Sequence, residues 1–225
     1  MRLIAALLDL LYPPRCVFCR AFVQSSEGMV CPACSADLVR ADGEAEQTQT
    51  GSCIPCVAPL YYEGNVKKSL RRYKFHGASH YAGAYGPILA GAVTRQLEGT
   101  YDLITWVPLS RARLRERGYD QALLLARAAA DALGERLTPT LKKVRNVQRQ
   151  STTGGAEARR SNIAGAYQVP EPERIRGKRI LLIDDIVTTG STLAECTRVL
   201  RAAGAAEVRC AALARARGAE AGESG

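Results

Sequence analysis

The chain has 225 residues, a length that suits one large domain or one domain with a small module attached. Apolar residues make up 47% of the chain and charged residues 24%, which excludes a disordered chain, a collagen-like fibre and a coiled-coil rod. Lysine and arginine outnumber aspartate and glutamate by 31 to 22. The resulting formal charge of +9 favours anionic partners such as phosphates, pyrophosphate or nucleic acid.

Residues 3–11 are predicted to form a short amphipathic helix that docks on the protein, because their large apolar side chains fall on one helical face. Pro13 and Pro14 end this helix. A membrane-surface helix is the less favoured alternative, since no stretch of the chain approaches the roughly 18 apolar residues of a membrane span. The segment also lacks the cleavage pattern of a secretory signal. We therefore expect a cytoplasmic protein without a membrane span.

Cysteine spacing gives the first specific signal, because six of the eight cysteines form three C-x-x-C pairs: Cys16/Cys19, Cys31/Cys34 and Cys53/Cys56. The first two pairs supply four thiolates with the spacing of a tetrahedral zinc site. Residues 15–56 contain few large apolar side chains, and small modules of this kind usually need a metal. Disulfides and redox pairs are the alternatives, but disulfides fit poorly with a chain that lacks an export signal. We predict one structural Zn²⁺, bound by Cys16, Cys19, Cys31 and Cys34.

The third pair, Cys53 and Cys56, has no partner pair, because residues 35–52 contain neither cysteine nor histidine. Either this pair recruits other ligands or it is the remnant of a lost site, so a complete second zinc site is not expected. Cys196 and Cys210 lie inside apolar patterns and are expected to be buried and inert.

Residues 38–52 are polar and turn-rich and are predicted to form a linker or long loop, after which strand and helix patterns alternate. Strands are expected at 57–62 (an edge strand, because it contains Pro59), 103–107, 137–141, 179–183 and 208–213. Helices are expected at 65–76, 81–97, 119–133 and 191–203, with Gly134 and Gly204 as stop signals. This alternation indicates a parallel sheet with helices on both faces, which would bind ligands beyond the carboxyl ends of its strands.

The strand predicted at 179–183 delivers Asp184 and Asp185 to its carboxyl end, and a loop of small residues then leads into a helix. Backbone N–H groups and hydroxyls at such a helix start form an anion-binding nest, here made of Thr188, Thr189, Gly190, Ser191 and Thr192. An acidic pair that binds a polyol, placed beside a monophosphate cradle, would suit a ribose 5-phosphate.

Three other interpretations of this segment compete with that one. A nucleotide-binding P-loop needs G-x-x-x-x-G-K-[ST], which does not occur here. A Mg²⁺ or phosphoacceptor site on the two aspartates would not explain the function of the threonine-rich loop that follows them. A strand–turn–helix with acids placed by chance is the third interpretation.

Residues 180–192 resemble the signature of type I phosphoribosyltransferases, which bind 5-phosphoribosyl 1-pyrophosphate (PRPP). Together with the cysteine pairs and Arg117-Gly118-Tyr119-Asp120-Gln121, residues 12–214 resemble the ComF family, whose members join a zinc ribbon to a phosphoribosyltransferase domain and are associated with DNA uptake in natural competence. The resemblance implies an α/β, type I phosphoribosyltransferase fold, a parallel sheet flanked by helices, with a small N-terminal zinc-ribbon segment. The expected division is an N-terminal helix and ribbon at 1–56, the phosphoribosyltransferase-like domain at 57–215 and a flexible tail at 216–225. The chain departs from the family in lacking one cysteine pair of a double ribbon.

The resemblance also implies roles for residues at the strand ends. Asp184 and Asp185 would hold the ribose hydroxyls, and the nest at 188–192 would bind the 5-phosphate. A pyrophosphate loop would comprise Pro108, Leu109, Ser110 and Arg111. Arg113, Arg115 and Arg117 would meet the leaving pyrophosphate, although a solvated basic loop is an equal alternative for the first two. The expected catalytic residues are Asp184, Asp185 and Arg117.

Two further segments resemble segments of the family, but their residues alone do not indicate what they do. Residues 142–160 fall where this fold carries a flexible lid, and Gln150, Ser151, Arg159, Arg160 and Asn162 match the family there; a mobile surface loop is the alternative. Residues 73–77, Tyr-Lys-Phe-His-Gly, could line an acceptor pocket, whereas His76 and His80 are expected to be structural.

The implied function is a Mg²⁺-dependent protein that binds PRPP and either transfers or senses ribose 5-phosphate. Transfer would substitute ribose C1 as pyrophosphate leaves, with the protein positioning the substrate and neutralising charge. Two alternatives stay open: a non-catalytic PRPP sensor, and a competence protein that binds single-stranded DNA or other competence proteins. Aromatic residues are only 6% of the chain, and no row of stacking residues favours the DNA interpretation.

Overall fold

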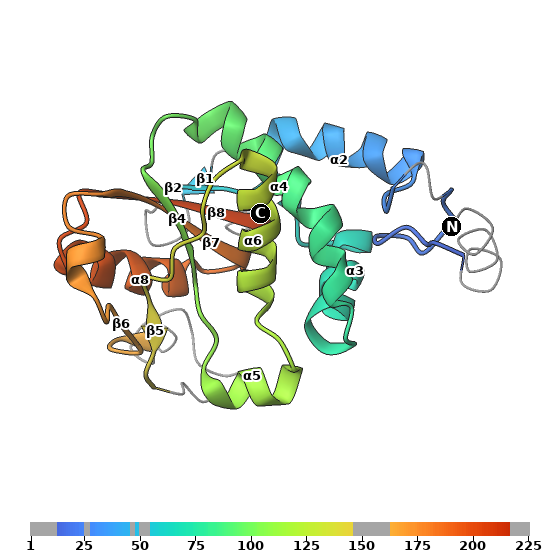
Figure 1. Cartoon of the computed structure of the whole chain (residues 1–225). Helices are drawn as coiled ribbons and strands as arrows, with labels where there is room; N and C mark the ends of the chain where they lie inside the picture. Colours follow the sequence, from blue (N-terminus) through green and yellow to red (C-terminus); the bar gives the residue numbers. More distant parts are fainter. Residues whose placement is uncertain (1–12, 25–27, 46–47, 50–54, 146–162, 217–225) are drawn as a thin grey trace, which may run out of the picture.

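The computed structural model describes residues 13–24, 28–45, 48–49, 55–145 and 163–216 (Figure 1). Its main sheet has the strand order β1-β2-β8-β7-β4, and β3 also pairs with β8. Every pair is parallel except β1 with β2. The strands are β1 (Thr48–Gln49), β2 (Pro55–Val57), β3 (Leu60–Tyr61), β4 (Leu103–Trp106), β7 (Arg179–Val187) and β8 (Glu207–Arg215). A separate antiparallel pair joins β5 (Lys142–Lys143) to β6 (Tyr167–Gln168).

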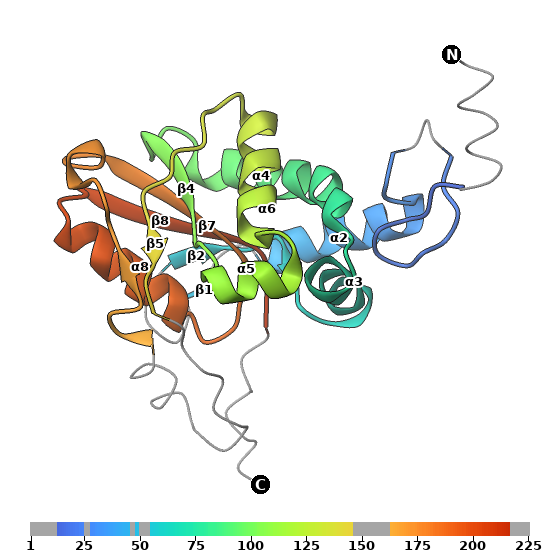
Figure 2. The same cartoon turned by 60° about the horizontal axis from the view of Figure 1, so that its bottom comes forward.

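Helices cover both faces of this sheet (Figures 1 and 2). They are α2 (Pro32–Ala45), α3 (Gly64–Phe75), α4 (Ala82–Leu97), α5 (Arg111–Arg117), α6 (Gln121–Leu133) and α8 (Ser191–Ala202), with short 3₁₀ turns η2 (Ser79–Tyr81) and η3 (Pro172–Arg174). Alternate residues of β7 face opposite sides: Leu181 and Ile183 join the core under α4 and α6, whereas Ile180 and Leu182 join the core under α8. The parallel sheet with helices on both faces is therefore confirmed.

Most predicted elements are confirmed to within a few residues. The strand at 57–62 is divided into β2 and β3 around Pro59. Within the described residues β3 pairs with β8 alone and so lies at an edge as predicted, whereas β2 lies between β1 and β8 and is not an edge strand. Gly134 ends α6 in the left-handed conformation, with φ of 71°. The helix at 3–11 and the tail beyond residue 216 lie outside the described residues. The division at residues 56 and 215 stays a prediction.

Two local predictions were wrong, and a third segment differs from one of the two interpretations given for it. Residues 38–52 are not a linker throughout, because α2 runs to Ala45; good helix formers fill its middle, and Leu38 packs against the main core. Residues 137–141 form a single parallel bridge from Leu137 to Ile104 instead of a strand, and the backbone N–H of Thr138 donates to the Ile104 carbonyl at 2.8 Å. The basic segment 111–117 is a helix, started by the Ser110 hydroxyl, which accepts a hydrogen bond from the backbone N–H of Arg113 at 3.4 Å.

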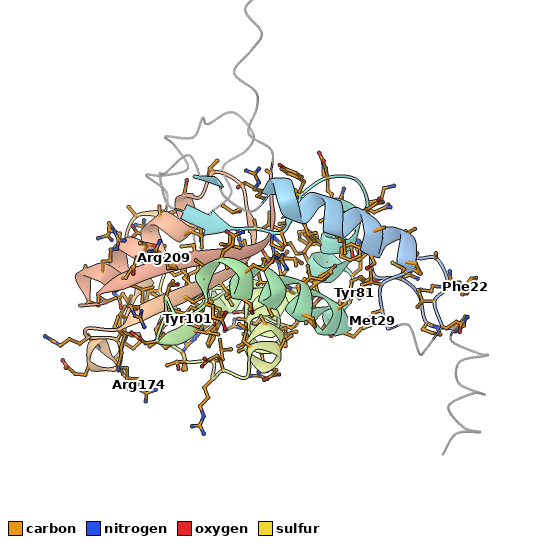
Figure 3. All side chains as sticks on the ribbon, turned by 90° about the horizontal axis from the view of Figure 1, so that it is seen from above. Phe22, Met29, Tyr81, Tyr101, Arg174 and Arg209 are labelled. Atoms are coloured by element: carbon orange, nitrogen blue, oxygen red, sulfur yellow. The ribbon has the colours of Figure 1, made fainter. Side chains whose placement is uncertain are left out.

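The zinc-ribbon segment lies at one end of the molecule beyond α3 (Figure 2). In Figure 3, Phe22 lies at its outer tip, whereas Tyr81 lies where the segment meets the helices. The Phe22 ring is 64% exposed, and the Arg15 guanidinium lies 4.2 Å from its centroid. None of the helices in the part of the chain that the structure describes is long and apolar enough to cross a bilayer.

Candidate zinc site and ribose-phosphate cavity

Two cysteine pairs converge at the predicted metal site. The Sγ atoms of Cys16, Cys19, Cys31 and Cys34 all lie within 4.8 Å of one another. The Cys19 and Cys31 sulfurs are 3.6 Å apart, close to the separation of about 3.8 Å that Zn–S bonds of about 2.3 Å give at tetrahedral angles. Four sulfurs at this spacing, three of them from buried residues, fit a closed structural Zn²⁺ site.

The backbone around Cys16 favours a thiolate ligand. Burial opposes the charged form, but hydrogen bonds from the backbone at Cys31, Cys19 and Phe18 outweigh it and lower the pKa of the Cys16 thiol to about 7. A thiol that ionises near neutral pH binds zinc with little cost of deprotonation.

The remaining described cysteines have a different environment. Cys196 and Cys210 are buried in the core under α8, which confirms the prediction for them. Cys56 lies on β2 next to Cys210, and burial raises its pKa well above the usual value, which disfavours the thiolate that zinc requires. Cys53 lies outside the described residues.

A cavity of about 370 Å³ opens at the carboxyl ends of β4 and β7, where a parallel sheet binds its ligands. Six segments supply its walls: the loop after β3, the end of α3, the loop after β4, α5 with the start of α6, the β5–β6 pair, and the end of β7 with the loop after it. Figures 1 and 2 show α5 between the β5–β6 pair and α3. The charged or hydroxyl-bearing lining residues are Tyr62, Lys74, Arg113, Arg117, Lys143, Tyr167, Asp184, Asp185, Thr188 and Thr192.

The predicted anion nest forms a smaller pocket of about 30 Å³ that continues from this cavity, because Asp184, Thr188 and Thr192 line both. Gly190 has φ of 72°, the left-handed conformation that a tight turn into α8 requires. The Thr189 and Ser191 hydroxyls lie 2.9 Å apart. The acidic pair and the nest thus lie together, as the sequence predicted.

The two aspartates differ in their partners. Asp185 pairs with Lys74, whose Nζ lies 2.8 Å from the carboxylate Oδ1. Asp184 accepts a hydrogen bond of 2.8 Å from the backbone N–H of Asp185. Burial and the neighbouring Asp185 charge nevertheless raise the pKa of Asp184 to about 7, although the Lys74 ammonium opposes this shift. Asp184 is therefore the group in this cavity that would change charge near neutral pH.

We expect the ionisation of Asp184 to destabilise the free protein as pH rises. An acid whose native pKa exceeds its unfolded pKa binds extra protons in the native state, so the free energy of unfolding falls between about pH 4 and the native pKa of about 7. Asp184→Asn removes this dependence. Urea unfolding measures the free energy of unfolding of wild type and variant. The wild-type value minus the variant value should fall by on the order of 1 kcal/mol per pH unit between pH 5 and pH 7. The exposed control Asp131→Asn should show no such trend; a pH-independent difference for Asp184→Asn would contradict the assignment.

The predicted pyrophosphate loop is held by Asp120. Its carboxylate accepts hydrogen bonds from the backbone N–H of Leu109 at 3.0 Å and of Leu123 at 3.1 Å, so one side chain caps α6 and fixes the loop after β4. Pro108 and Leu109 line the cavity, whereas Ser110 caps α5 and Arg111 lies exposed on that helix.

The three arginines of α5 have different positions. Arg113 and Arg117 line the cavity, and Arg115 is exposed to solvent away from it. Arg117 donates a hydrogen bond of 2.9 Å to the Gln121 side chain, and its guanidinium lies 5.1 Å from the centre of the Phe75 ring. These contacts hold Arg117 at the cavity wall.

The sequence assigned no specific role to four side chains of the cavity wall, those of Lys74, Phe75, Lys143 and Tyr167. Lys74 and Phe75 come from the segment at 73–77, for which the sequence suggests only a place at the acceptor pocket. Lys143 donates a hydrogen bond of 3.0 Å to the Tyr167 hydroxyl across β5 and β6, and burial lowers its pKa. Of the predicted lid at 142–160, residues 142–145 are described and include β5, whereas residues 146–160 and the neighbouring Asn162 lie outside the described residues.

Comparisons with known proteins agree with this geometry. Residues 120–224 match the phosphoribosyl transferase domain, and residues 7–63 match the double zinc ribbon domain. Competence protein F of Haemophilus influenzae is 27% identical over 90% of this chain and 97% of its own length. Competence protein ComFC of Bacillus subtilis is 28% identical, with 82% and 77% covered. DNA utilization protein YhgH of Salmonella typhi is 32% identical, with 65% of each chain covered.

The model that matches residues 7–63 covers the four converging cysteines, and the model that matches residues 120–224 covers β7, the loop after it, α8 and β8. The relatives that cover 90% of this chain include Competence protein F and proteins named DNA utilization protein YhgH. The chain belongs to the ComF family, with a zinc ribbon and a type I phosphoribosyltransferase fold.

Proposed function

We propose that the protein binds PRPP with Mg²⁺ in the cavity at the ends of β4 and β7, and that it transfers or senses ribose 5-phosphate in DNA uptake. The observation that supports this proposal is the wall shared by the two pockets, where the Asp184 carboxylate lies beside Thr188 and Thr192 at the start of a helix. A ribose 5-phosphate carries vicinal hydroxyls and a phosphate on one ring, so its hydroxyls could bind the carboxylate while its phosphate binds the helix start.

The remaining charges of the cavity support a pyrophosphate group on that ribose. Lys74, Arg113, Arg117 and Lys143 all line the cavity, which gives it more cationic than anionic side chains. Cations at a cavity wall stabilise the negative charge that develops on a leaving pyrophosphate. Asp184 and the buried Asp185 are hard oxygen ligands of the kind that Mg²⁺ prefers, either directly or through water. When bound, the ion would neutralise charge on the pyrophosphate and ribose oxygens.

Transfer and sensing use the same binding residues and differ in the fate of the bound ligand. Release of pyrophosphate from PRPP in the presence of an acceptor would support transfer, whereas binding without turnover would support a sensor. The link to DNA uptake comes from the family, and the relatives' names refer to competence and DNA utilization. A cytoplasmic location is part of this proposal.

We expect PRPP with Mg²⁺ to stabilise the wild-type protein, and this stabilisation is the test of the proposed site. At a ligand concentration of 100 times the dissociation constant, the free energy of unfolding should rise by roughly 2.7 kcal/mol. Thermal unfolding with and without the ligand measures this shift in wild type and in Asp184→Asn/Asp185→Asn, which should lose it. The exposed carboxylate variant Asp131→Asn should keep it. No shift at millimolar PRPP would reject the proposed ligand and make single-stranded DNA the next candidate.

A further inference from the structure

Helix α3 contacts both the zinc ribbon and the ribose-phosphate cavity. Its residues Ser69 and Arg72 face the ribbon, and its last two residues, Lys74 and Phe75, line the cavity. Because an α-helix rises about 1.5 Å per residue, Arg72 and Lys74 are separated by only about 3 Å along the helix axis.

The ribbon side of this connection is a set of hydrogen bonds to the turn between Cys16 and Cys19. The Arg72 guanidinium donates from one nitrogen to the carbonyl oxygens of Val17 and Phe18, each at 2.8 Å. The Ser69 hydroxyl also donates to the Val17 carbonyl. Val17 and Phe18 are buried in the main core, so the turn cannot move without disturbing α3. Zinc bound by Cys16 and Cys19 would fix the two carbonyls that Arg72 requires.

The middle of the connection is Tyr73, which is fully buried beside Arg72. Its hydroxyl donates a hydrogen bond of 2.8 Å to the Gln121 carbonyl, and its own carbonyl accepts one from the Tyr119 hydroxyl. These bonds join the last turn of α3 to the start of α6, where Gln121 also accepts from Arg117 of the cavity wall.

The cavity side of the connection is the ion pair between Lys74 and Asp185, with 2.8 Å between Nζ and Oδ1. Lys74 is mostly buried, with 18% of its side chain exposed, so its ammonium has little freedom to compensate for a shift of the helix. The neighbouring Phe75 ring stacks on Arg117. Displacement of the end of α3 would therefore move two cations of the anion-binding wall.

We propose that zinc bound in the ribbon controls, through α3, the affinity of the ribose-phosphate cavity for PRPP. Arg72 is the positioning residue, and it acts through Lys74. This inference rests on the proposed binding of PRPP. With zinc bound, the Cys16–Cys19 turn holds Arg72 by two charge-assisted hydrogen bonds, and Lys74 stays beside Asp185. Without zinc those acceptors move, and the cavity loses an ordered cation. By linkage, the ligand must increase the affinity for zinc by the same factor as zinc increases the affinity for the ligand.

The first experiment uses calorimetry of PRPP with Mg²⁺ on zinc-loaded variants whose zinc content is measured. Arg72→Ala should weaken binding by roughly fivefold or more, the lower range of coupling between sites in proteins. Arg71→Ala is the matched control, since Arg71 is exposed on the same helix, and should bind like wild type. Arg72→Lys keeps the charge and should recover part of the affinity.

A double-substitution cycle separates positioning from a general loss of structure. If Arg72 acts through Lys74, then Arg72→Ala should cause little further loss of affinity in a Lys74→Ala background. Additive losses would show that Arg72 supports the fold without acting through Lys74, and would overturn the proposal.

The second experiment measures zinc affinity in the wild-type chain by equilibrium competition with a chelator, with and without PRPP and Mg²⁺. The ligand should raise zinc affinity by roughly fivefold or more, and this effect should vanish in Lys74→Ala, which also controls for zinc binding by PRPP itself. Equal zinc affinities in a wild-type protein that binds PRPP would overturn the coupling alone. A wild-type protein that does not bind PRPP would instead reject the proposed function, and the coupling with it.

Discussion

Replacing Cys34 by serine is expected to abolish stoichiometric zinc binding and to destabilise the protein by more than about 4 kcal/mol, the range that loss of a structural metal produces. The four sulfurs converge within 4.8 Å, so removal of one leaves an incomplete site. Binding of structural zinc by small modules is worth about 10–16 kcal/mol, and most of it appears as folding free energy. Two measurements check this expectation: zinc content by metal analysis and the midpoint of thermal unfolding.

The expected loss is large because the ribbon shares its core with the rest of the chain. Phe18 packs against Tyr85 of α4, with 5.8 Å between ring centres, and Val17 is fully buried in the same cluster. Loss of the metal therefore exposes side chains under α3 and α4 as well as the ribbon itself. Ser35→Ala, on the exposed side of the same helix turn, is the control and should behave like wild type. A Cys34→Ser protein that keeps one zinc and the wild-type midpoint would show that the four sulfurs are not the metal site.

Gly86→Ala is expected to destabilise the protein by about 2–3 kcal/mol, the upper range for overpacking a core. A Cβ at this position would lie 2.5 Å from both the carbonyl carbon and the Cβ of Ala128, and 2.7 Å from the Ala128 carbonyl oxygen. Two of these atoms belong to the backbone of α6, so α4 and α6 would have to separate. Chemical unfolding in urea measures the change in free energy.

The matched control is Gly83→Ala in the same helix. No heavy atom lies within 4 Å of a Cβ built at Gly83, apart from its own helix and chain neighbours. Alanine favours a helix over glycine by roughly 0.5–1 kcal/mol, so this variant should be as stable as wild type or slightly more stable. Opposite signs for two identical substitutions in one helix would identify the α4–α6 contact as the cause. Equal effects at both positions would contradict it.

Signals confined to a short stretch of sequence were sufficient for the two main sites. Spacing alone brings each C-x-x-C pair into one turn, and the order of strand, acidic pair, small-residue loop and helix places Asp184 next to the nest by chain continuity. The parallel sheet was predictable from alternating strand and helix patterns, because chain connectivity and sheet twist leave few other arrangements. Chain continuity determines the turn within each C-x-x-C pair and the position of Asp184 beside the loop, whereas the fold brings the two pairs and the strands together.

Features that depend on packing between distant segments needed the tertiary structure. Lys74 pairs with Asp185, and Lys143 contacts Tyr167. The sequence around each of these residues does not indicate which distant residue it contacts. The extension of α2 to Ala45 depends partly on a core that Leu38 reaches only after folding. The way in which the helices pack on the sheet determines which side chains meet across a cavity. The distances between such side chains cannot be predicted from the sequence alone. The sequence by itself therefore determined the four converging cysteines, the position of Asp184 beside the loop at 188–192 and the class of fold. Tertiary packing decided which cations line the cavity and how the ribbon connects to it.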